Sequence, residues 1–179
     1  SADSEWSLQY YHTRNFGRDS FQVPLPFPVL MANYDQTQYR DDIEFQMTNR
    51  LGATTRLVWG AEARRESVEA PGYFYRRGEL SGDMYRLFAN LEWMPHTDWS
   101  INAGAMAEQH YYSDMDISPR LAVNYRLTPN HGLRASIGQA FRSPTFFEVE
   151  GDLRYVRTTG AVLGQRFAPA GNLEPEKIV

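Results

Sequence analysis

Five segments of the chain alternate between apolar and polar residues, and this alternation constrains the fold more than any other feature. The segments span residues 54–64, 84–93, 99–108, 120–127 and 133–142. On one parity, which begins with Leu57 and Trp59, no residue is charged. On the opposite parity ten residues are charged: Arg56, Glu62, Arg64, Arg86, Glu92, Glu108, Arg120, Arg126, Arg134 and Arg142. A period of two is that of a β-strand. Two weaker segments of the same period, 5–12 and 41–48, precede them, and no helix is expected, so the sequence predicts an all-β antiparallel sheet.

The connections between these segments alternate between short and long. The short ones are 49–53, 95–98 and 128–132, and the long ones are 13–36, 67–81, 112–118 and 143–171. This order predicts an up-and-down meander whose short turns all lie at one end, as in a transmembrane β-barrel. A compact soluble domain rarely carries two structureless loops of more than about 20 residues. An apolar run of about 18 residues, which a membrane helix needs, is missing, but a membrane strand needs only about 9–11.

Aromatic residues mark both ends of the uncharged parity. Trp93, Trp99 and Tyr125 lie beside the short turns, and Tyr85 and Phe141 lie near the long loops. Two such girdles around an apolar band are typical of a membrane barrel. The charged parity carries too many charges for a small, side-chain-filled barrel, so it indicates a wide lumen that holds water. A soluble β-sandwich remains an alternative, because its strands alternate in the same way.

Composition excludes several classes of function. The net charge of −4 and the pI near 5.6 give no basic surface for nucleic acid. The absence of cysteine excludes disulfides, thiolate zinc sites and cysteine nucleophiles. No motif of a hydrolase, metalloprotease or phosphate-binding loop occurs, so we expect neither catalysis nor a cofactor. The chain starts without a methionine and reads as a piece of a longer protein.

Two short motifs resemble those of a known family. "FRSPTFFE" ends the last alternating segment, and "NLEPE" follows the long loop after it. The pair is similar to a motif of TonB-dependent outer-membrane receptors, although Leu173 here follows Asn172 without the usual intervening residue. The matching residues include Phe141, Arg142, Pro144, Thr145, Glu148, Asn172, Leu173, Pro175 and Glu176. The close match covers about residues 117–177, and residues 1–116 fit the family by architecture only.

The resemblance implies a fold, a location and a function. The fold would be a segment of an antiparallel up-and-down transmembrane β-barrel of about 22 strands in the bacterial outer membrane. Residues 1–179 would be part of the barrel domain, and the plug domain and TonB-contacting segment would lie outside this chain. Its partners would be outer-membrane lipid, an iron chelate, most often a siderophore, and TonB. The arginine-lined wall would let an anionic solute pass. A passive porin or adhesin barrel without TonB coupling is the alternative.

The motif residues are expected to shape a strand–loop junction rather than to contact ligand. Phe141 would lie at the outer girdle and Arg142 would face the lumen at the same height. Pro144 lacks an N–H and would stop strand pairing. Glu148 is close enough in sequence to bond Arg142 or the nearby backbone.

Three long loops are candidates for ligand contact, because aromatic rings and arginines suit an anionic aromatic chelate. The candidates are Tyr73, Tyr75, Arg76, Arg77, His110, Tyr111, Tyr112, Arg154, Tyr155 and Arg157. Solvated loop tips without a ligand role are the alternative. His110, with Asp114 and Asp116, leaves metal, haem or Ca²⁺ binding open, although the loop 145–171 carries no histidine for haem and no metal site is assigned. The apolar segment 21–31, with three prolines, is expected in the barrel mouth or on another loop.

Overall fold

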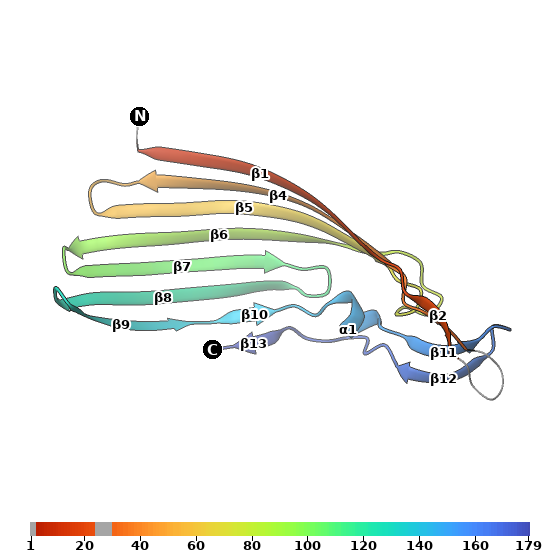
Figure 1. Ribbon diagram of the computed structural model, residues 1–179. Coiled ribbons are helices and arrows are strands. Elements are labelled where there is room, and N and C mark those ends of the chain that lie inside the picture. The colour runs from red at the N-terminus through yellow and green to blue at the C-terminus, as the bar shows by residue number, and fades with distance from the viewer. Residues whose placement is uncertain (1–2, 24–29) are drawn as a thin grey trace.

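Seven long strands form one antiparallel sheet in chain order in the computed structural model, which describes residues 3–23 and 30–179 (Figure 1). They are β1 (Ser4–Gly17), β4 (Gln36–Arg50), β5 (Thr55–Glu69), β6 (Leu80–His96), β7 (Trp99–Gln109), β8 (Met115–Thr128) and β9 (His131–Gly138). The short connections lie together at one end of the sheet and the longer ones at the other (Figure 1). The predicted meander is confirmed, and most strands are longer than expected.

The strand register places the residues of the uncharged parity in continuous rows across the sheet. One row contains Leu8, Phe45, Ala61, Leu87, Ala107 and Ile117. This face, called the uncharged face below, is open: Leu87 is 64% exposed and Ile137 is 69% exposed. It is therefore not packed against a second layer, as the core of a β-sandwich would be.

The height of the uncharged face matches a bilayer. Along β8 it runs from Met115 to Tyr125, roughly 34 Å of strand, which a tilt of about 40° reduces to roughly 26 Å of height. That is close to the apolar band of about 25 Å in outer-membrane barrels. Trp99 stacks on Tyr125 at the short-turn end, with ring centroids 4.5 Å apart. At the other end the next row is polar and contains His12, Asp41, Arg65 and Asp83.

The prediction of one continuous strand over residues 133–142 is wrong, because the strand breaks at Gln139 into β9 and β10 (Ala140–Arg142). Pro119 of β8 lies opposite Gln139. The Gln139 N–H donates to the Pro119 carbonyl at 3.0 Å, but proline has no N–H to donate in return. The ladder with β8 is interrupted there, and β10 pairs instead with β13 (Glu176–Ile178), the strand that the second motif opens.

The long loops are not structureless, contrary to expectation. Strands β2 (Ser20–Val23), β3 (Leu30–Asn33), β11 (Leu153–Arg157) and β12 (Val162–Phe167) form a second sheet in the order β12-β11-β3-β2. A third loop joins it, because Tyr75 N donates to the Asp152 carbonyl at 3.0 Å and Asp152 N donates to the Tyr73 carbonyl at 2.8 Å. Part of the apolar segment 21–31 therefore pairs with another loop, while residues 24–29 lie outside the described residues.

One short helix, α1 (Phe146–Glu150), corrects the expectation of none. Its first turn is closed by a capping box, in which the Glu148 N–H donates to Thr145 Oγ1 at 3.3 Å and the Thr145 N–H donates to Glu148 Oε2 at 2.8 Å. The signature was readable in the motif as Thr-x-x-Glu. Within the described ranges, no helix is long and apolar enough to cross a membrane.

Arg142 ties the two motifs together. Its Nε and Nη2 donate to Glu176 at 2.9 Å, and its Nη1 and Nη2 donate to Glu148 at 3.1 and 3.0 Å. Arg142, Thr145, Glu148 and Glu176 are called the Arg142 clasp below. A guanidinium suits this role because its planar fork can serve two carboxylates at once. The clasp fixes α1 against β10 and β13, the strands before and after the connecting segment of about thirty residues that contains α1.

We expect the uncharged face to lie against lipid, which Ile137→Arg tests in the full-length receptor. Ile137 lies near the middle of the band, so an arginine there should destabilise the folded barrel by about 2–4 kcal/mol. Ser136→Arg, one residue earlier on the charged face, should change the stability by no more than about 0.5 kcal/mol. Denaturant unfolding in lipid vesicles measures both. Equal losses for the two variants would contradict the assignment of faces.

The clasp should resist moderate acid. The Arg142 guanidinium, with further hydrogen bonds from Thr145, lowers the pKa of Glu148 from 4.5 to about 2. Because the folded pKa is depressed, the clasp should be fully stabilising above about pH 4.5 and should weaken only as the pH falls toward 2. A nitroxide at Glu174→Cys should keep its mobility from pH 7 to about pH 4.5 and gain mobility below it. Glu148→Gln should be mobile already at pH 7, and a wild-type transition above pH 5 would contradict the clasp.

Candidate functional site

A pocket of about 400 Å³ opens on the charged face, at the end of the sheet where the long loops lie. Strands β1, β4 and β5 form one side, and α1 with the loops after β5 and β7 forms the other. Its lining includes Thr13, Asn15, Gln36, Gln38, Arg40, Glu66, Val68, Ala70, Tyr73, Phe74, Tyr111, Thr145, Phe146 and Phe147. Its size falls in the range of small-molecule sites, about 300–1,000 Å³.

The strand side of the pocket carries neutral hydrogen-bonding groups. Thr13 and Asn15 come from β1, and Gln36 and Gln38 come from β4, where Asn15 lies opposite Gln38. All four side chains lie on the same face of the sheet as Arg40, which is the charged face. Among these four side chains, Gln38 Nε2 donates a hydrogen bond to Gln36 Oε1 at 3.4 Å. Their amides and hydroxyl therefore keep capacity for a ligand.

The opposite side of the pocket is aromatic. Tyr111 stacks on Phe146 with ring centroids 4.5 Å apart, and Tyr73 meets Phe147 edge to face at 5.8 Å. Tyr111 lies directly over Gly82 of β6, where a Cβ atom would come within 2.2 Å of its ring. Glycine at position 82 therefore makes room for the ring.

A small apolar cluster holds the aromatic side in place. Val68, Ala70 and Phe74 are buried, and Phe74 is only 3% exposed. Tyr73, Leu80 and Phe146 pack against them. The rings that line the pocket are thus partly preordered, which lowers the conformational entropy lost on binding.

The tyrosines of the β7–β8 loop are protonated. Burial raises the pKa of Tyr111, and the nearby Glu66 carboxylate raises it further. Burial raises the pKa of Tyr112 to about 12. Burial also lowers the pKa of His110, which is therefore neutral at pH 7. Among residues 3–23 and 30–179, no group of three or more histidine and carboxylate side chains could hold a metal ion. The possibility of a metal-ion or Ca²⁺ site in this loop therefore gains no support from the described residues.

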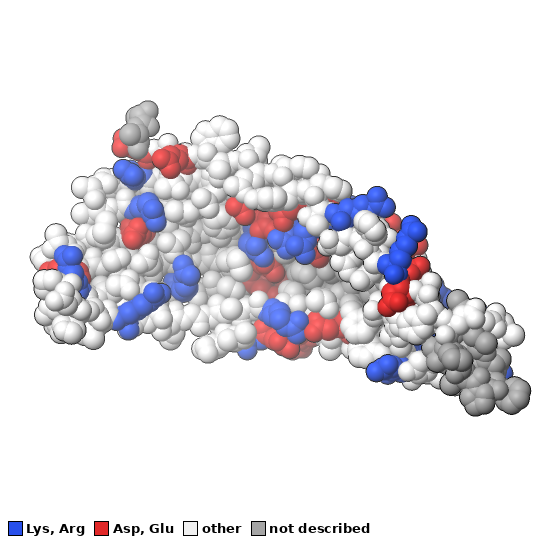
Figure 2. Space-filling model, in the orientation of Figure 1, with Lys and Arg blue, Asp and Glu red and all other residues white. Residues whose placement is uncertain are grey.

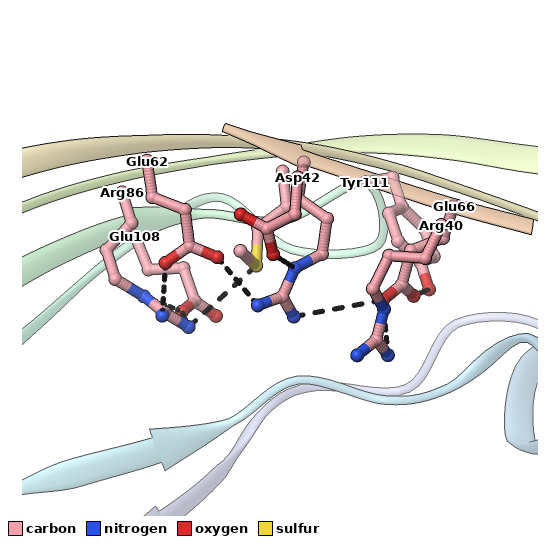
Figure 3. Close-up of polar contacts among 9 residues, drawn as sticks. Arg40, Asp42, Glu62, Glu66, Arg86, Glu108 and Tyr111 are labelled. Carbon is pink, nitrogen blue, oxygen red and sulfur yellow. Dashed lines mark hydrogen bonds and ion pairs between the residues drawn. The ribbon is translucent and has the colours of Figure 1, made fainter. Parts of the chain in front are cut away.

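Below the pocket, the charged face carries a chain of ion pairs (Figure 3). Arg40 pairs with Glu66 at 2.8 Å, and Arg64 pairs with Asp42 at 2.7 Å and Glu62 at 2.6 Å. Arg86 continues the chain to Glu62 at 2.6 Å and to Glu108 at 2.7 Å. Figure 2 shows charges of both signs side by side over the middle of this face. The arginine-lined wall is therefore neutralised in its middle by cross-strand carboxylates. Nearer the short turns, Arg120 and Arg134 have no carboxylate partner among the described residues.

The structure divides the ten candidate ligand residues. Tyr73 and Tyr111 line the pocket, and His110 and Tyr112 pack against Tyr111 behind it. Tyr75, Arg76, Arg77, Arg154, Tyr155 and Arg157 lie outside the pocket lining.

Two of the four arginines among these candidates are held by carboxylates. Arg77 pairs with Glu150 at 3.0 Å and Arg154 with Asp152 at 2.7 Å. Arg76 and Arg154 both lie over the Tyr75 ring, with guanidinium carbons 5.4 and 4.6 Å from its centroid. These contacts brace the loops against one another, whereas Arg76 and Arg157 have no carboxylate partner among the described residues.

The family motif contributes to both the junction and the pocket. Arg142, Glu148 and Glu176 form the clasp, Pro144 is buried, and Phe141 lies opposite Lys177 in the β10–β13 pair. Asn172 and Leu173 are exposed and Pro175 is half-buried. Thr145, with its neighbours Phe146 and Phe147, also lines the pocket. This contact was not expected from the sequence.

The strand side of the pocket was also missed. Thr13, Asn15, Gln36 and Gln38 carry no motif, and polar residues on the charged parity are indistinguishable from any water-facing position. The available signal was their place just beyond the uncharged band, on the charged parity. The pair "FF" after Thr145 was a second signal, because two phenylalanines rarely begin a purely solvated loop.

Comparisons with known proteins agree with this architecture. The family model described as TonB dependent receptor-like, beta-barrel, matches residues 1–179. A search of curated proteins gives no significant match.

A solved structure with a similar fold is the crystal structure of the siderophore receptor PirA from Pseudomonas aeruginosa. The two chains share 15% identity, and the TM-score is 0.69. The match covers 99% of this chain and 39% of that one, so the chain spans well under half of that receptor's length. The family match over all 179 residues, together with the open antiparallel meander, shows that the chain belongs to the TonB-dependent receptor β-barrel family.

Proposed function

We propose that this chain is part of the barrel of an outer-membrane receptor that takes up an iron chelate, namely a siderophore complex, with energy from TonB. The observation that carries the proposal is the pocket of hydrogen-bonding and aromatic groups on the charged face, at the long-loop end. The similarity in fold to a siderophore receptor supports it. The family match favours a receptor over a passive porin or adhesin barrel.

Each part of the chain has a role in this proposal. The uncharged face lies against outer-membrane lipid, and the charged face lines the lumen. The three joined loops and α1 hold Tyr73, Tyr111, Phe146 and Phe147 at the mouth, where a chelate would be captured from outside. The plug and the TonB-contacting segment would belong to a longer protein and would act on the captured ligand. The family and the structural neighbour are receptors rather than enzymes.

Growth under iron limitation tests the proposed function. A strain without the gene should lose growth on at least one ferric chelate, and the full-length gene should restore it. Restoration should fail when the TonB system is inactive. Normal uptake of every ferric chelate tried by the deletion strain would remove the transport claim.

A glycine substitution tests the pocket itself. In the full-length receptor, Gly82→Ala places a methyl group where the Tyr111 ring lies, so Tyr111 must move away from Phe146. We expect binding of the transported chelate to weaken by about 1–2 kcal/mol, a factor of about 5–30 in Kd. Gly78→Ala is the matched control, because a Cβ there meets nothing within 4 Å. Equal affinities for Gly82→Ala and wild type, measured by titration calorimetry, would contradict the assignment.

A further inference from the structure

We propose that the pocket selects iron chelates without net charge over anionic ones. The inference rests on the proposed function and adds the charge class of its substrate. It reverses the expectation, drawn from the many arginines of the sequence, that this wall favours anions.

Among the described residues that line it, the pocket offers no free cation. Its two charged residues are Arg40 and Glu66, and they pair with each other at 2.8 Å. Glu66 also lies 3.8 Å from Arg64 and accepts from the Tyr111 hydroxyl at 3.4 Å. The remaining groups that face the ligand are amides, hydroxyls and aromatic rings, which are neutral at pH 7.

The wall below the pocket carries an excess of negative charge. The linked cluster has three arginines, Arg40, Arg64 and Arg86, and four carboxylates, Asp42, Glu62, Glu66 and Glu108, so its net charge is −1. Two more carboxylates belong to the same row of the sheet, because Glu44 lies opposite Glu62 and Asp116 lies opposite Glu108. An anion that leaves the pocket meets like charge on this part of the wall before it can reach Arg120, which has no carboxylate partner among the described residues.

Three arginines outside the pocket lining are also held by carboxylates, whereas Arg76 and Arg157 have no carboxylate partner among the described residues. The Arg142 clasp sets one arginine against two carboxylates, Glu148 and Glu176, and also has a net charge of −1. Arg77 and Arg154 in the loops are paired with Glu150 and Asp152. To bind an anion, these arginines would have to give up carboxylates that already hold them at 2.7–3.0 Å.

An uncharged chelate avoids these costs. Its carbonyl and N–H groups can bond Asn15, Gln36 and Gln38 without displacing an ion pair, and its apolar chain can lie against Phe146 and Tyr111. Like charges set against each other across an interface weaken binding, whereas neutral hydrogen bonds carry no such penalty. Charge, more than shape, therefore separates the two classes of chelate at this site.

The test uses the full-length receptor in detergent and two iron(III) probes, a neutral trihydroxamate chelate and a trianionic tris-catecholate chelate. We expect the neutral chelate to bind at least about tenfold more tightly. Glu66→Gln removes the carboxylate from Arg40 and should raise the affinity for the anionic chelate relative to the affinity for the neutral one. Glu92→Gln is the matched control, since it frees Arg56, paired at 3.2 Å, on the same face at the short-turn end.

The outcomes separate this inference from the proposed function. Tighter binding of the catecholate by the wild type would overturn the charge selectivity and leave an iron-chelate receptor in place. Equal gains for Glu66→Gln and Glu92→Gln would also overturn it, because selectivity would then not arise at the pocket. Binding of neither chelate would remove both claims. Gln38→Lys is the second variant, to be used if Glu66→Gln fails to fold. It adds a cation at an exposed position without breaking an ion pair, and it should strengthen anion binding in the same way.

Discussion

The structure depends on the cost of placing charge or unpaired backbone in hydrocarbon. Strands can cross a bilayer only when neighbours satisfy their N–H and C=O groups, and each strand must present an uncharged side to lipid. The chain meets both demands with one device, a period of two held in register over seven strands. Because side chains alternate in direction, every charge excluded from the lipid side is forced onto the other. The high number of charges on the charged face is therefore a direct consequence of their exclusion from the uncharged face.

Crowding on the charged face is resolved by pairing. The register that aligns the uncharged rows also sets Glu62 opposite Arg86, and Arg86 opposite Glu108. Cross-strand pairs of opposite sign stabilise a sheet, and they neutralise the arginines in the middle of the wall. Near the long loops the ionic groups give way to amides, and the aromatic rings of α1 and the loops close over them. The candidate site therefore lies where the side chains on the water-facing side of the sheet change from charged to neutral.

The sequence predicted the strands and their faces well, because alternation is a local signal. Glu148 was expected near Arg142, and the structure adds Glu176, which only the pairing of β10 with β13 brings to the same guanidinium. The helix α1 was missed although its capping box was legible, since five residues give no helical period. The second sheet was missed because β3 and β11 are more than 100 residues apart, and no local pattern reports such pairing. Whether an arginine is free or paired likewise depends on register, so the expected cationic wall could not be checked from the sequence.

The most direct test of this account is an accessibility scan along β6 in the full-length receptor in lipid vesicles. Single nitroxides at residues 84–93 would be exposed in turn to oxygen, which partitions into lipid, and to a water-soluble nickel chelate. The account predicts a period of two, with Tyr85, Leu87, Ala89, Leu91 and Trp93 favouring oxygen and the residues between them favouring the nickel chelate or shielded from both. A scan without that alternation, or with the two faces exchanged, would contradict it.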